Sequence, residues 1–320
     1  MLGEILSTLN IGEKLVRLLK WLKKERYSAP ESMSARFVRL FESHNVHRNQ
    51  IPRFFGHGLT LKDVQSDADL LLKLDETLLQ AACDLFAVRR EWLDGADNQI
   101  FPIHRFYKHP QAFVEFLGAL KAANPDGELS GVVLAPVKPA PDVEAVLVLL
   151  ETVGWVGDKA IYRYHFCDEW SLRYWKSRAY LTACVAIAWR QGVFIHGVYA
   201  DGERLQKLTE GLALPSWSAD GIWSFGIKRW DPEDMALRPD AFLDGLDAER
   251  DNFGLQAGLR LWLSLCDDGF MNTGLGTHNI DETRQSFYQA LDQIDHCFEP
   301  RLPSGNPVPR SDLKLNGRKG

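Results

Sequence analysis

The spacing of the apolar residues changes along the chain, and this change constrains the fold more than any other feature. Apolar side chains recur at helical spacing in the first 95 residues, as in EKLVRLLKWLKKER at 13–26. Strand-like runs follow later, GVVLAPVKP at 131–139 and AIYRYHF at 160–166. The sequence therefore predicts an α+β protein, in which an N-terminal all-α helical bundle precedes a mixed α/β domain.

Turn and capping residues divide the helical part into short segments. Ser32 or Ser34 can cap the second helix, and His47 or Asn49 can cap the third. Pro52 falls in the first turn of that third helix, where a missing N–H costs no intrahelical hydrogen bond. The five helices predicted before Gly95 cover residues 13–26, about 35–44, a short segment ending at 55, 67–74 and 76–86.

The rest of the chain mixes both kinds of pattern. We expect an apolar helix at 143–153, and residues 179–200 form either an antiparallel hairpin or a helix that ends at Gly192 followed by one strand. The other expected elements are helices at 111–123, 202–211, 248–266 and 281–298 and a strand near 222–228. The predicted organisation is a helical domain (1–97), a junction (98–110), a mixed α/β domain for ligand sensing or oligomerisation (111–300) and a flexible tail (301–320).

The charge of the chain is unevenly distributed. The 320 residues carry a formal net charge of -6, yet residues 1–60 hold 10 lysines and arginines against 5 acidic residues. Residues 61–110 hold 6 against 9, and residues 111–320 hold 21 against 29. A basic head on an acidic body is expected if only the head meets a polyanion, although the solvated face of an amphipathic helix gives the same charge pattern.

The cysteines and the apolar runs argue against several classes of protein. Five widely spaced cysteines without a CxxC pair indicate neither a disulfide framework nor a zinc ribbon. Charged residues interrupt every apolar run before it can span a bilayer, and MLGEIL at the start is unlike a secretory signal. We therefore expect a cytoplasmic protein with reduced thiols and no membrane segment.

The order of the N-terminal signals resembles a known family. NVHRNQIPRFFG (45–56) looks like the turn and recognition helix of the lambda-repressor-like (XRE-type) helix-turn-helix family, and LFAVRREWLDG (85–95) looks like its closing segment. The resemblance covers about residues 13–95. It implies a helix-turn-helix head and, together with a second domain, a bacterial transcriptional regulator that binds paired half-sites of double-stranded DNA as a homodimer.

The candidate DNA-binding residues surround the predicted recognition helix. A helix that enters the major groove needs side chains that read base edges and donors that hold phosphates; arginine suits guanine, and asparagine and glutamine suit adenine. The candidates for base edges are His47, Arg48, Asn49, Gln50 and Arg53, and those for phosphates are Lys20, Lys23, Lys24 and Arg36. The alternative is an exposed polar turn that reads no DNA or that binds a protein.

Tryptophan and tyrosine are dense between Trp155 and Trp230. Each combines a large apolar body with a hydrogen-bonding tip, so these residues line cavities and interfaces as well as cores. The candidates for a site that binds a small-molecule effector are Tyr164, His165, Trp170, Trp175 and His196. Ordinary core packing is the alternative for the same residues.

No catalytic, metal or cofactor motif stands out. HFCDEW (165–170) and HCFE (296–299) lack the ligand spacing of a metal site, and adjacent strand residues point to opposite faces. GLGTH (274–278) lacks the GK[ST] ending of a phosphate loop. We predict no enzyme activity, no metal and no cofactor. The alternatives to a regulator are a protein-interaction adaptor whose head binds a partner chain, and an enzyme whose aromatic-rich cleft uses His165, Asp168 or His196 as acid or base.

Overall fold

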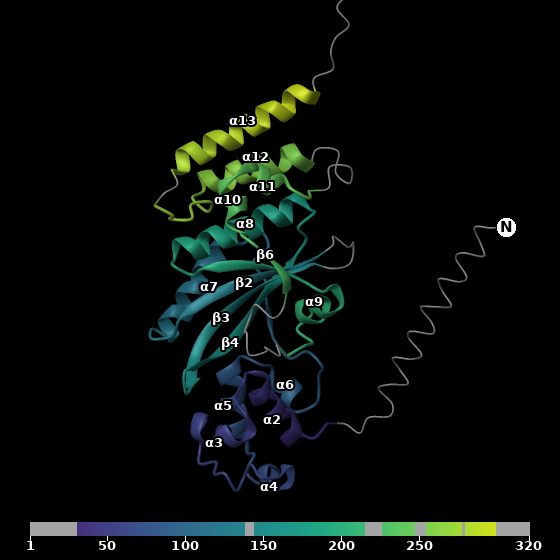
Figure 1. Ribbon diagram of the computed structural model, residues 1–320, viewed down its shortest axis with the longest axis vertical. Coiled ribbons are helices and arrows are strands. Elements are labelled where there is room, and N and C mark those ends of the chain that lie inside the picture. The colour runs from purple at the N-terminus through teal and green to yellow at the C-terminus, as the bar shows by residue number, and fades with distance from the viewer. Residues whose placement is uncertain (1–30, 138–143, 215–225, 247–253, 277–278, 299–320) are drawn as a thin grey trace, which may run out of the picture.

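A mixed β-sheet lies between two layers of helices. The computed structural model describes residues 31–137, 144–214, 226–246, 254–276 and 279–298. The N-terminal helices lie on one side of the sheet and the C-terminal helices on the other (Figure 1). The predicted α+β class with a helical N-terminal region is therefore confirmed.

The N-terminal helices form a compact head over residues 31–95. Its elements are α2 (Met33–Ser43), η1 (Arg48–Gln50), α3 (Ile51–Phe54), α4 (Asp67–Leu71), α5 (Glu76–Phe86) and α6 (Arg90–Leu93). Polar caps start the longer ones: Ser32 Oγ accepts the Ala35 N–H at 3.2 Å, and Asp75 Oδ1 accepts the Leu78 N–H at 2.8 Å. The predicted helices near 35–44, 67–74 and 76–86 are confirmed, and the one predicted at 13–26 lies outside the described residues.

The sheet is built around an antiparallel meander. Its strands are β1 (Ile103–His104), β2 (Leu129–Pro136), β3 (Ala145–Val156), β4 (Lys159–Trp170), β5 (Ile195–Ala200) and β6 (Gly226–Trp230), in the spatial order β1-β4-β3-β2-β5-β6. β2, β3 and β4 pair antiparallel, while β5 lies parallel to β2 and β1 parallel to β4. β6 closes the other edge antiparallel to β5.

The helix predicted at 143–153 is wrong, because residues 145–156 form the long strand β3. Both faces of this strand are covered by helices, so apolar side chains are needed on both and the alternation that marks a strand is lost. Val146, Val148 and Leu150 face the head, whereas Leu147 and Leu149 face the opposite layer.

Of the two structures expected for 179–200, the hairpin is wrong and the helix followed by a strand is confirmed. Helix α8 (Trp175–Arg190) precedes β5, and Gly192 adopts a positive φ of 72° between them. Nearly every side of α8 is buried, so it lacks the polar face that would reveal a helical period.

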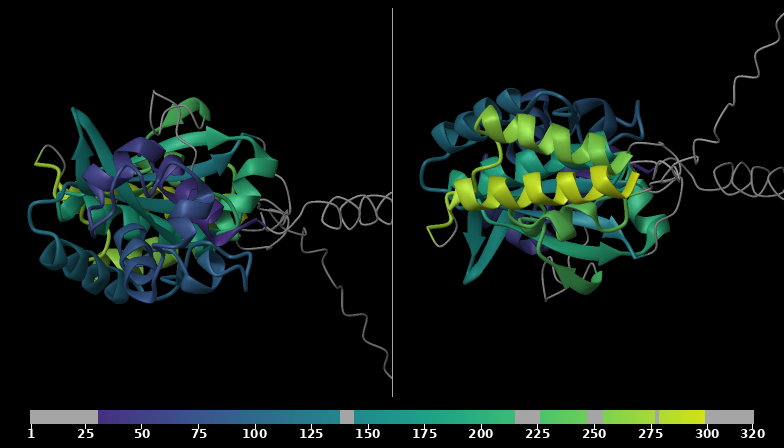
Figure 2. Two further views of the ribbon diagram at one scale, coloured as in Figure 1. Left: turned by 90° about the horizontal axis from the view of Figure 1, so that it is seen from below. Right: turned by 90° about the horizontal axis from the view of Figure 1, so that it is seen from above.

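The remaining helices complete the two layers. α9 (Gly202–Thr209) covers the head side of the sheet, where Leu205 and Leu208 join the core. The opposite layer contains α7 (Pro110–Ala123), α8, α10 (Asp234–Leu237), α11 (Pro239–Leu243), α12 (Gly254–Asp267) and α13 (Ile280–Phe298). α12 and α13 lie side by side at its surface (Figure 2), and the rings of Trp262 and Phe287 stack between them at 3.6 Å.

The head and the sheet share one buried apolar cluster. Head residues such as Phe41 and Phe86 pack in the same cluster as Val148 and Tyr164 of the sheet. The ring of His44 lies at this joint, 4.1 Å from the Phe86 ring and 5.2 Å from the Tyr164 ring. The division predicted at 98–110 stays a prediction, and the packing makes the head part of the sheet's own core.

The described helices and cysteines bear on two further expectations. Within the described ranges, no helix is both long enough and apolar enough to cross a membrane. Cys83, Cys167 and Cys184 are buried, and Cys266 is half-buried.

Candidate functional site

The predicted recognition segment folds as two short consecutive helices, η1 and α3, which form the compact recognition turn of residues 47–54. The His47 ring nitrogen Nδ1 accepts the Asn49 N–H at 3.3 Å, and Gln50 Oε1 accepts the His47 N–H at 3.0 Å. These reciprocal bonds form a capping box at the start of η1. Pro52 lies in the first turn of α3, and Ile51 is fully buried, so the turn is anchored by its apolar side.

The polar side chains of this turn fall into two groups. The exposed ones are His47, Asn49, Gln50 and Arg53. Arg48 is instead bound within the protein: its Nε donates to the Val64 carbonyl oxygen at 2.5 Å, and its Nη2 pairs with Asp67 Oδ1 at 2.7 Å. Arg48 therefore fastens the turn to the beginning of α4.

The residues predicted to contact phosphates also fall into two groups, since Arg36 is described and the three lysines are not. Arg36 Nη1 donates to the Trp92 carbonyl oxygen at 2.5 Å, its Nε lies 3.7 Å from Glu31 Oε2, and its side chain is 15% exposed. Arg36 thus joins α2 to α6. Lys20, Lys23 and Lys24 lie outside the described residues.

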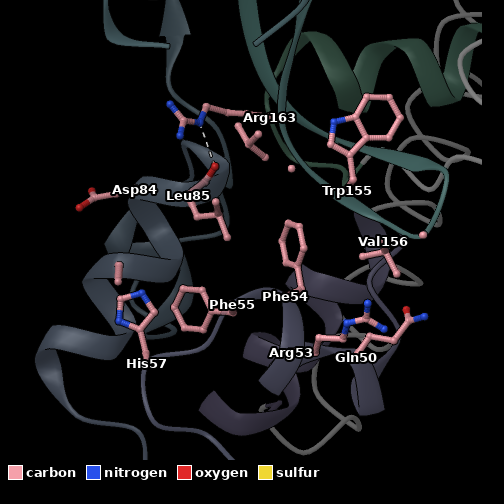
Figure 3. A pocket seen from close by; sticks show the side chains of 14 residues that line it. Gln50, Arg53, Phe54, Phe55, His57, Asp84, Leu85, Trp155, Val156 and Arg163 are labelled. Atoms are coloured by element: carbon pink, nitrogen blue, oxygen red, sulfur yellow. Dashed lines mark hydrogen bonds between the residues drawn. The ribbon is translucent and has the colours of Figure 1, made fainter. Parts of the chain in front are cut away.

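A pocket of about 610 Å³ opens beside the recognition turn, between the head and the hairpin of β3 and β4 (Figure 3). The head contributes residues from η1 to His57 and from α5, and the hairpin contributes residues 153–157 and Arg163. The side chains that give it chemical character are Gln50, Arg53, Phe54, Phe55, His57, Trp155 and Arg163. The exposed Gln50 and Arg53 of the turn therefore also line a concave surface.

Close packing of the head on the hairpin shapes this pocket. A Cβ atom on Gly154 would lie 2.7 Å from Cε2 of Phe54, so only glycine lets the ring rest against the strand. The ring of Phe55 lies 4.3 Å from that of His57. Trp155 is 57% exposed, which is unusual for the largest apolar side chain.

Two arginines bring positive charge to the pocket. Within the described residues, the Arg53 guanidinium makes no hydrogen bond or ion pair. Arg163 is held in place, since its Nε donates to the Leu85 carbonyl oxygen at 2.8 Å and its Nη1 lies 3.5 Å from Glu151 Oε2. Asp84 is the acidic residue of the lining, and one of its carboxylate oxygens accepts a hydrogen bond from Gln80.

The structure does not bring the five predicted effector-binding residues together. Tyr164 packs with the head, whereas His165, the next residue of β4, points to the opposite side of the sheet. Trp170 is fully buried, and its Nε1 donates to the Cys167 carbonyl oxygen at 2.7 Å. Trp175 is half-buried at the start of α8, and His196 is exposed on β5. The side chain of Asp168 lies outside the described part.

His165 belongs to a sealed polar cluster. Its Nε2 lies 2.8 Å from Glu151 Oε2, and Asn124 Nδ2 donates to Glu151 Oε1 at 3.0 Å. Burial acts to raise the pKa of Glu151, but hydrogen bonds from His165 and Asn124 and the charge of Arg163 together hold that pKa below its ordinary value. Glu151 is 2% and His165 5% exposed, so the cluster contributes to stability and offers little access to a ligand.

His104 of β1 extends this cluster without making a metal site. Its ring lies 6.0 Å from the His165 ring and 4.5 Å from the Phe116 ring. Burial and the neighbouring His165 lower the pKa of His104 to about 4. Among the described residues, no group of three or more His, Cys, Asp and Glu side chains is placed to hold a metal ion.

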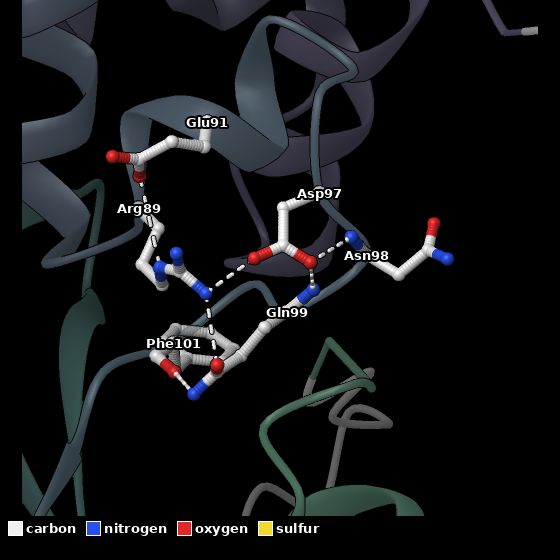
Figure 4. A network of polar contacts seen from close by, with 6 residues as sticks. All are labelled: Arg89, Glu91, Asp97, Asn98, Gln99 and Phe101. Carbon is white, nitrogen blue, oxygen red and sulfur yellow. Dashed lines mark hydrogen bonds and ion pairs between the residues drawn. The ribbon is translucent and has the colours of Figure 1, made fainter.

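A second polar network fixes the segment that leaves the head (Figure 4). Arg89 Nη1 donates to Asp97 Oδ2 at 2.6 Å and to Gln99 Oε1 at 2.8 Å. The backbone then continues the attachment, because the Ile100 N–H donates to the Gly211 carbonyl oxygen at 2.8 Å. The orientation of the head against α9 is thus held by hydrogen bonds as well as by the shared core.

The fold and the pocket define an α+β protein with a helical head docked on a mixed sheet and an open, cationic and aromatic hollow between them. No protein-family model, no curated protein and no solved structure matches the chain.

Sequence reasoning selected Gln50 and Arg53 but did not connect them with the hairpin. In the sequence, Trp155 is one of many aromatic residues, and Arg163 is a residue of a predicted strand. Their available signal was the WVGDK turn at 155–159, which places Trp155 at a hairpin tip. Which surface that tip meets depends on the register of β3 and β4.

Proposed function

We propose that the protein is a DNA-binding transcriptional regulator whose head contacts double-stranded DNA through the turn at 47–53. The readers of base edges in this proposal are His47, Asn49, Gln50 and Arg53. Arginine can donate two hydrogen bonds to guanine, and the amides of asparagine and glutamine can pair in the same way with adenine.

One observation carries the proposal. Within the described residues, the exposed side chains of Asn49 and Arg53 form no hydrogen bond or ion pair, while the turn that bears them is anchored by the buried Ile51. Rigid backbone and uncommitted polar ends are what direct readout requires. Arg48 and Arg36 take a different role here, because both guanidinium groups already hold the head together.

The proposal keeps the wider architecture expected from the sequence. Lys20, Lys23 and Lys24 would contact phosphates, a homodimer would read paired half-sites, and the α/β part would sense an effector or mediate self-association in a bacterial cytoplasm. The charge of residues 31–60, which include this turn, is in keeping with a contact to a polyanion, since they carry 4 basic and 2 acidic residues. Residues 1–30 carry 6 basic and 3 acidic residues, so both halves of the first 60 residues contribute to their surplus of base.

The test begins with selection of bound sequences from a library of random duplexes. Binding of the selected duplex is then measured by fluorescence anisotropy for the wild type, Asn49→Ala, Arg53→Ala and the control Arg105→Ala. Arg105 is exposed after β1 and outside the pocket lining, so its loss removes the same charge from another surface.

Arg53→Ala is expected to weaken binding about tenfold and to relax selectivity at one base pair, because a bidentate contact contributes about 1–3 kcal/mol. Arg105→Ala should bind within about twofold of the wild type, since a distant charge acts only through a screened field. Failure to enrich any sequence, or equal binding by the two arginine variants, refutes the proposal.

A protein-interaction adaptor is the second candidate, and a specific surface favours it. Leu61, Leu71 and Leu72 on and beside α4 are 58%, 51% and 85% exposed. Exposed leucines close in sequence are typical of surfaces that bind another chain. If no duplex is enriched and Leu72→Ser abolishes capture of one defined partner, the protein is an adaptor and not a regulator.

A further inference from the structure

The pocket between the head and the hairpin contains groups that the proposed DNA contact leaves unused, above all the exposed ring of Trp155 and the guanidinium of Arg163. We propose that it binds a planar aromatic molecule carrying an anionic group, the chemistry of a nucleoside monophosphate. This proposal goes beyond the DNA contact and does not depend on it.

Trp155 at the hairpin tip offers a surface for the aromatic part of the ligand. Its side chain is 57% exposed at the pocket, although burying an indole ring is strongly favoured. Figure 3 shows Trp155 on the hairpin side of the hollow, with Phe54 and Phe55 on the head side. A flat ring lying against Trp155 would bury apolar surface that the folded chain leaves open, and an aromatic base offers such a face.

The two arginines of the pocket can bind the anionic group of the ligand. Arg53 is exposed at the lower rim, and Arg163 lies across the hollow on β4 (Figure 3). The hydrogen bond to the Leu85 carbonyl holds Arg163 in place, and within the described residues its Nη2 forms no hydrogen bond. A guanidinium presents paired donors to a phosphate or carboxylate, so each arginine can bind an anion directly.

The volume and the remaining polar groups narrow the class of ligand. About 610 Å³ falls in the middle of the range of small-molecule sites, roughly 300–1,000 Å³. Asp84 and Gln50 add acceptors that suit the amino and ring N–H groups of a base. A lone inorganic anion would leave Trp155 exposed, and a neutral ring would leave Arg53 without a partner.

The experiment measures binding by titration calorimetry on the full chain. Four probes separate the parts of the ligand: adenosine 5′-monophosphate, adenosine, ribose 5-phosphate and indole-3-acetate, which joins an aromatic ring to a carboxylate. Trp155→Ala and Arg53→Ala test the two halves of the pocket. Phe194→Ala and Arg105→Ala are the matched controls, since Phe194 is 53% exposed and neither residue lines the pocket.

The nucleotide should bind more tightly than adenosine or ribose 5-phosphate. Trp155→Ala and Arg53→Ala should each weaken it about tenfold, the size expected for the loss of one stacked ring or one charge-assisted contact, while the controls stay within about twofold. Binding of indole-3-acetate alone, with the same dependence on both residues, supports the shared chemistry and assigns the anion to a carboxylate.

Two results would refute the proposal that this pocket binds an aromatic anion. One is the absence of heat with both the nucleotide and indole-3-acetate at millimolar concentration, and the other is binding that neither Trp155→Ala nor Arg53→Ala weakens. The wild type is tested against the selected DNA duplex in parallel. Binding of the duplex without binding of an aromatic anion refutes only the pocket proposal. Binding of the nucleotide without binding of a duplex refutes only the proposed DNA-binding function.

Discussion

The strands β3 and β4 carry two polar sites that differ in almost every respect. Near the middle of the strands, Glu151 and His165 face each other at 2.8 Å and are nearly inaccessible to solvent. At the hairpin end, Trp155 is mostly exposed, and Arg53 of the head stands across an open pocket from Arg163. Arg163 takes part in both, because it pairs with Glu151 and also lines the pocket.

The difference separates polar groups that stabilise the fold from those available for binding. In the sealed cluster, Asn124, Arg163 and His165 all act on the carboxylate of Glu151, so little capacity is left for a ligand. In the pocket, Arg53 has no partner within the described residues. The histidine and carboxylates of HFCDEW (165–170) point to the first site as a candidate for chemistry. The second site, however, has the exposed side chains that could bind a ligand.

Breaking the sealed cluster should give the largest loss of stability. Glu151→Ala leaves His165 and Arg163 without their carboxylate in a buried setting, and removal of one partner of such a pair costs about 3–5 kcal/mol. Urea unfolding measures the effect, and Glu203→Ala is the control, because Glu203 and Lys207 form an exposed ion pair on α9. Equal midpoints for the two variants would mean that the cluster is not a stabilising element.

Acid should weaken the joint between the head and the sheet. Burial lowers the pKa of His44 from 6.5 to about 4, so between these values the unfolded chain binds a proton that the folded chain excludes. Stability therefore falls as pH falls through this window, and the share of His44 is about 2 kcal/mol at pH 5. The measurement is the free energy of unfolding at pH 7 and pH 5.

His44→Gln is the control for this pH effect, because the variant has no titrating ring. It should reduce the loss between pH 7 and pH 5, while the share of His104, whose pKa is also about 4, remains. An unchanged loss in His44→Gln would show that His44 does not carry the effect.

Adding one methyl group at the head–hairpin contact should affect both stability and binding. The Cβ of Gly154→Ala would meet Phe54 at 2.7 Å, so this ring of the pocket lining must shift at a cost of about 1–2 kcal/mol. Calorimetry should show weaker nucleotide binding per folded molecule. Gly118→Ala on α7 is matched to it, since nothing lies within 4 Å there and alanine favours a helix. Equal nucleotide affinities of Gly154→Ala and Gly118→Ala would contradict this prediction.

The two arginines of the recognition turn should give the smallest and most specific contrast. Arg48→Ala loses its bonds to Val64 and Asp67 and should lower stability by about 1 kcal/mol. Arg53→Ala should change stability by no more than about 0.5 kcal/mol, because its side chain is exposed. Thermal unfolding of the two variants measures these changes. A larger loss of stability for Arg53→Ala than for Arg48→Ala would show that Arg53, and not Arg48, stabilises the fold.

The sequence predicted the elements whose signals are local. Ser32 caps α2 and His47 caps η1, and each is one of the two capping residues predicted for its helix. β3 was missed because covering both of its faces removes the alternation that identifies a strand. For α8, an apolar surface on nearly all sides left two structures open.

The candidate site was predictable only in its head half. Asn49, Gln50 and Arg53 lie within one turn, so their common exposure follows from helix geometry and from the apolar Ile51 beside them. Trp155 and Arg163 reach the pocket through pairing of β3 with β4 and through docking of Phe54 on Gly154. Contacts between residues a hundred positions apart leave no periodic trace in a single sequence.

Hydrogen–deuterium exchange of the full chain, with and without the selected duplex, tests the central claim most directly. The account predicts slower exchange at residues 47–55 when the duplex is present, and no change in the strand segment around Glu151 and His165. Protection confined to that sealed segment, or no protection at the turn under conditions where the duplex is bound, would contradict it.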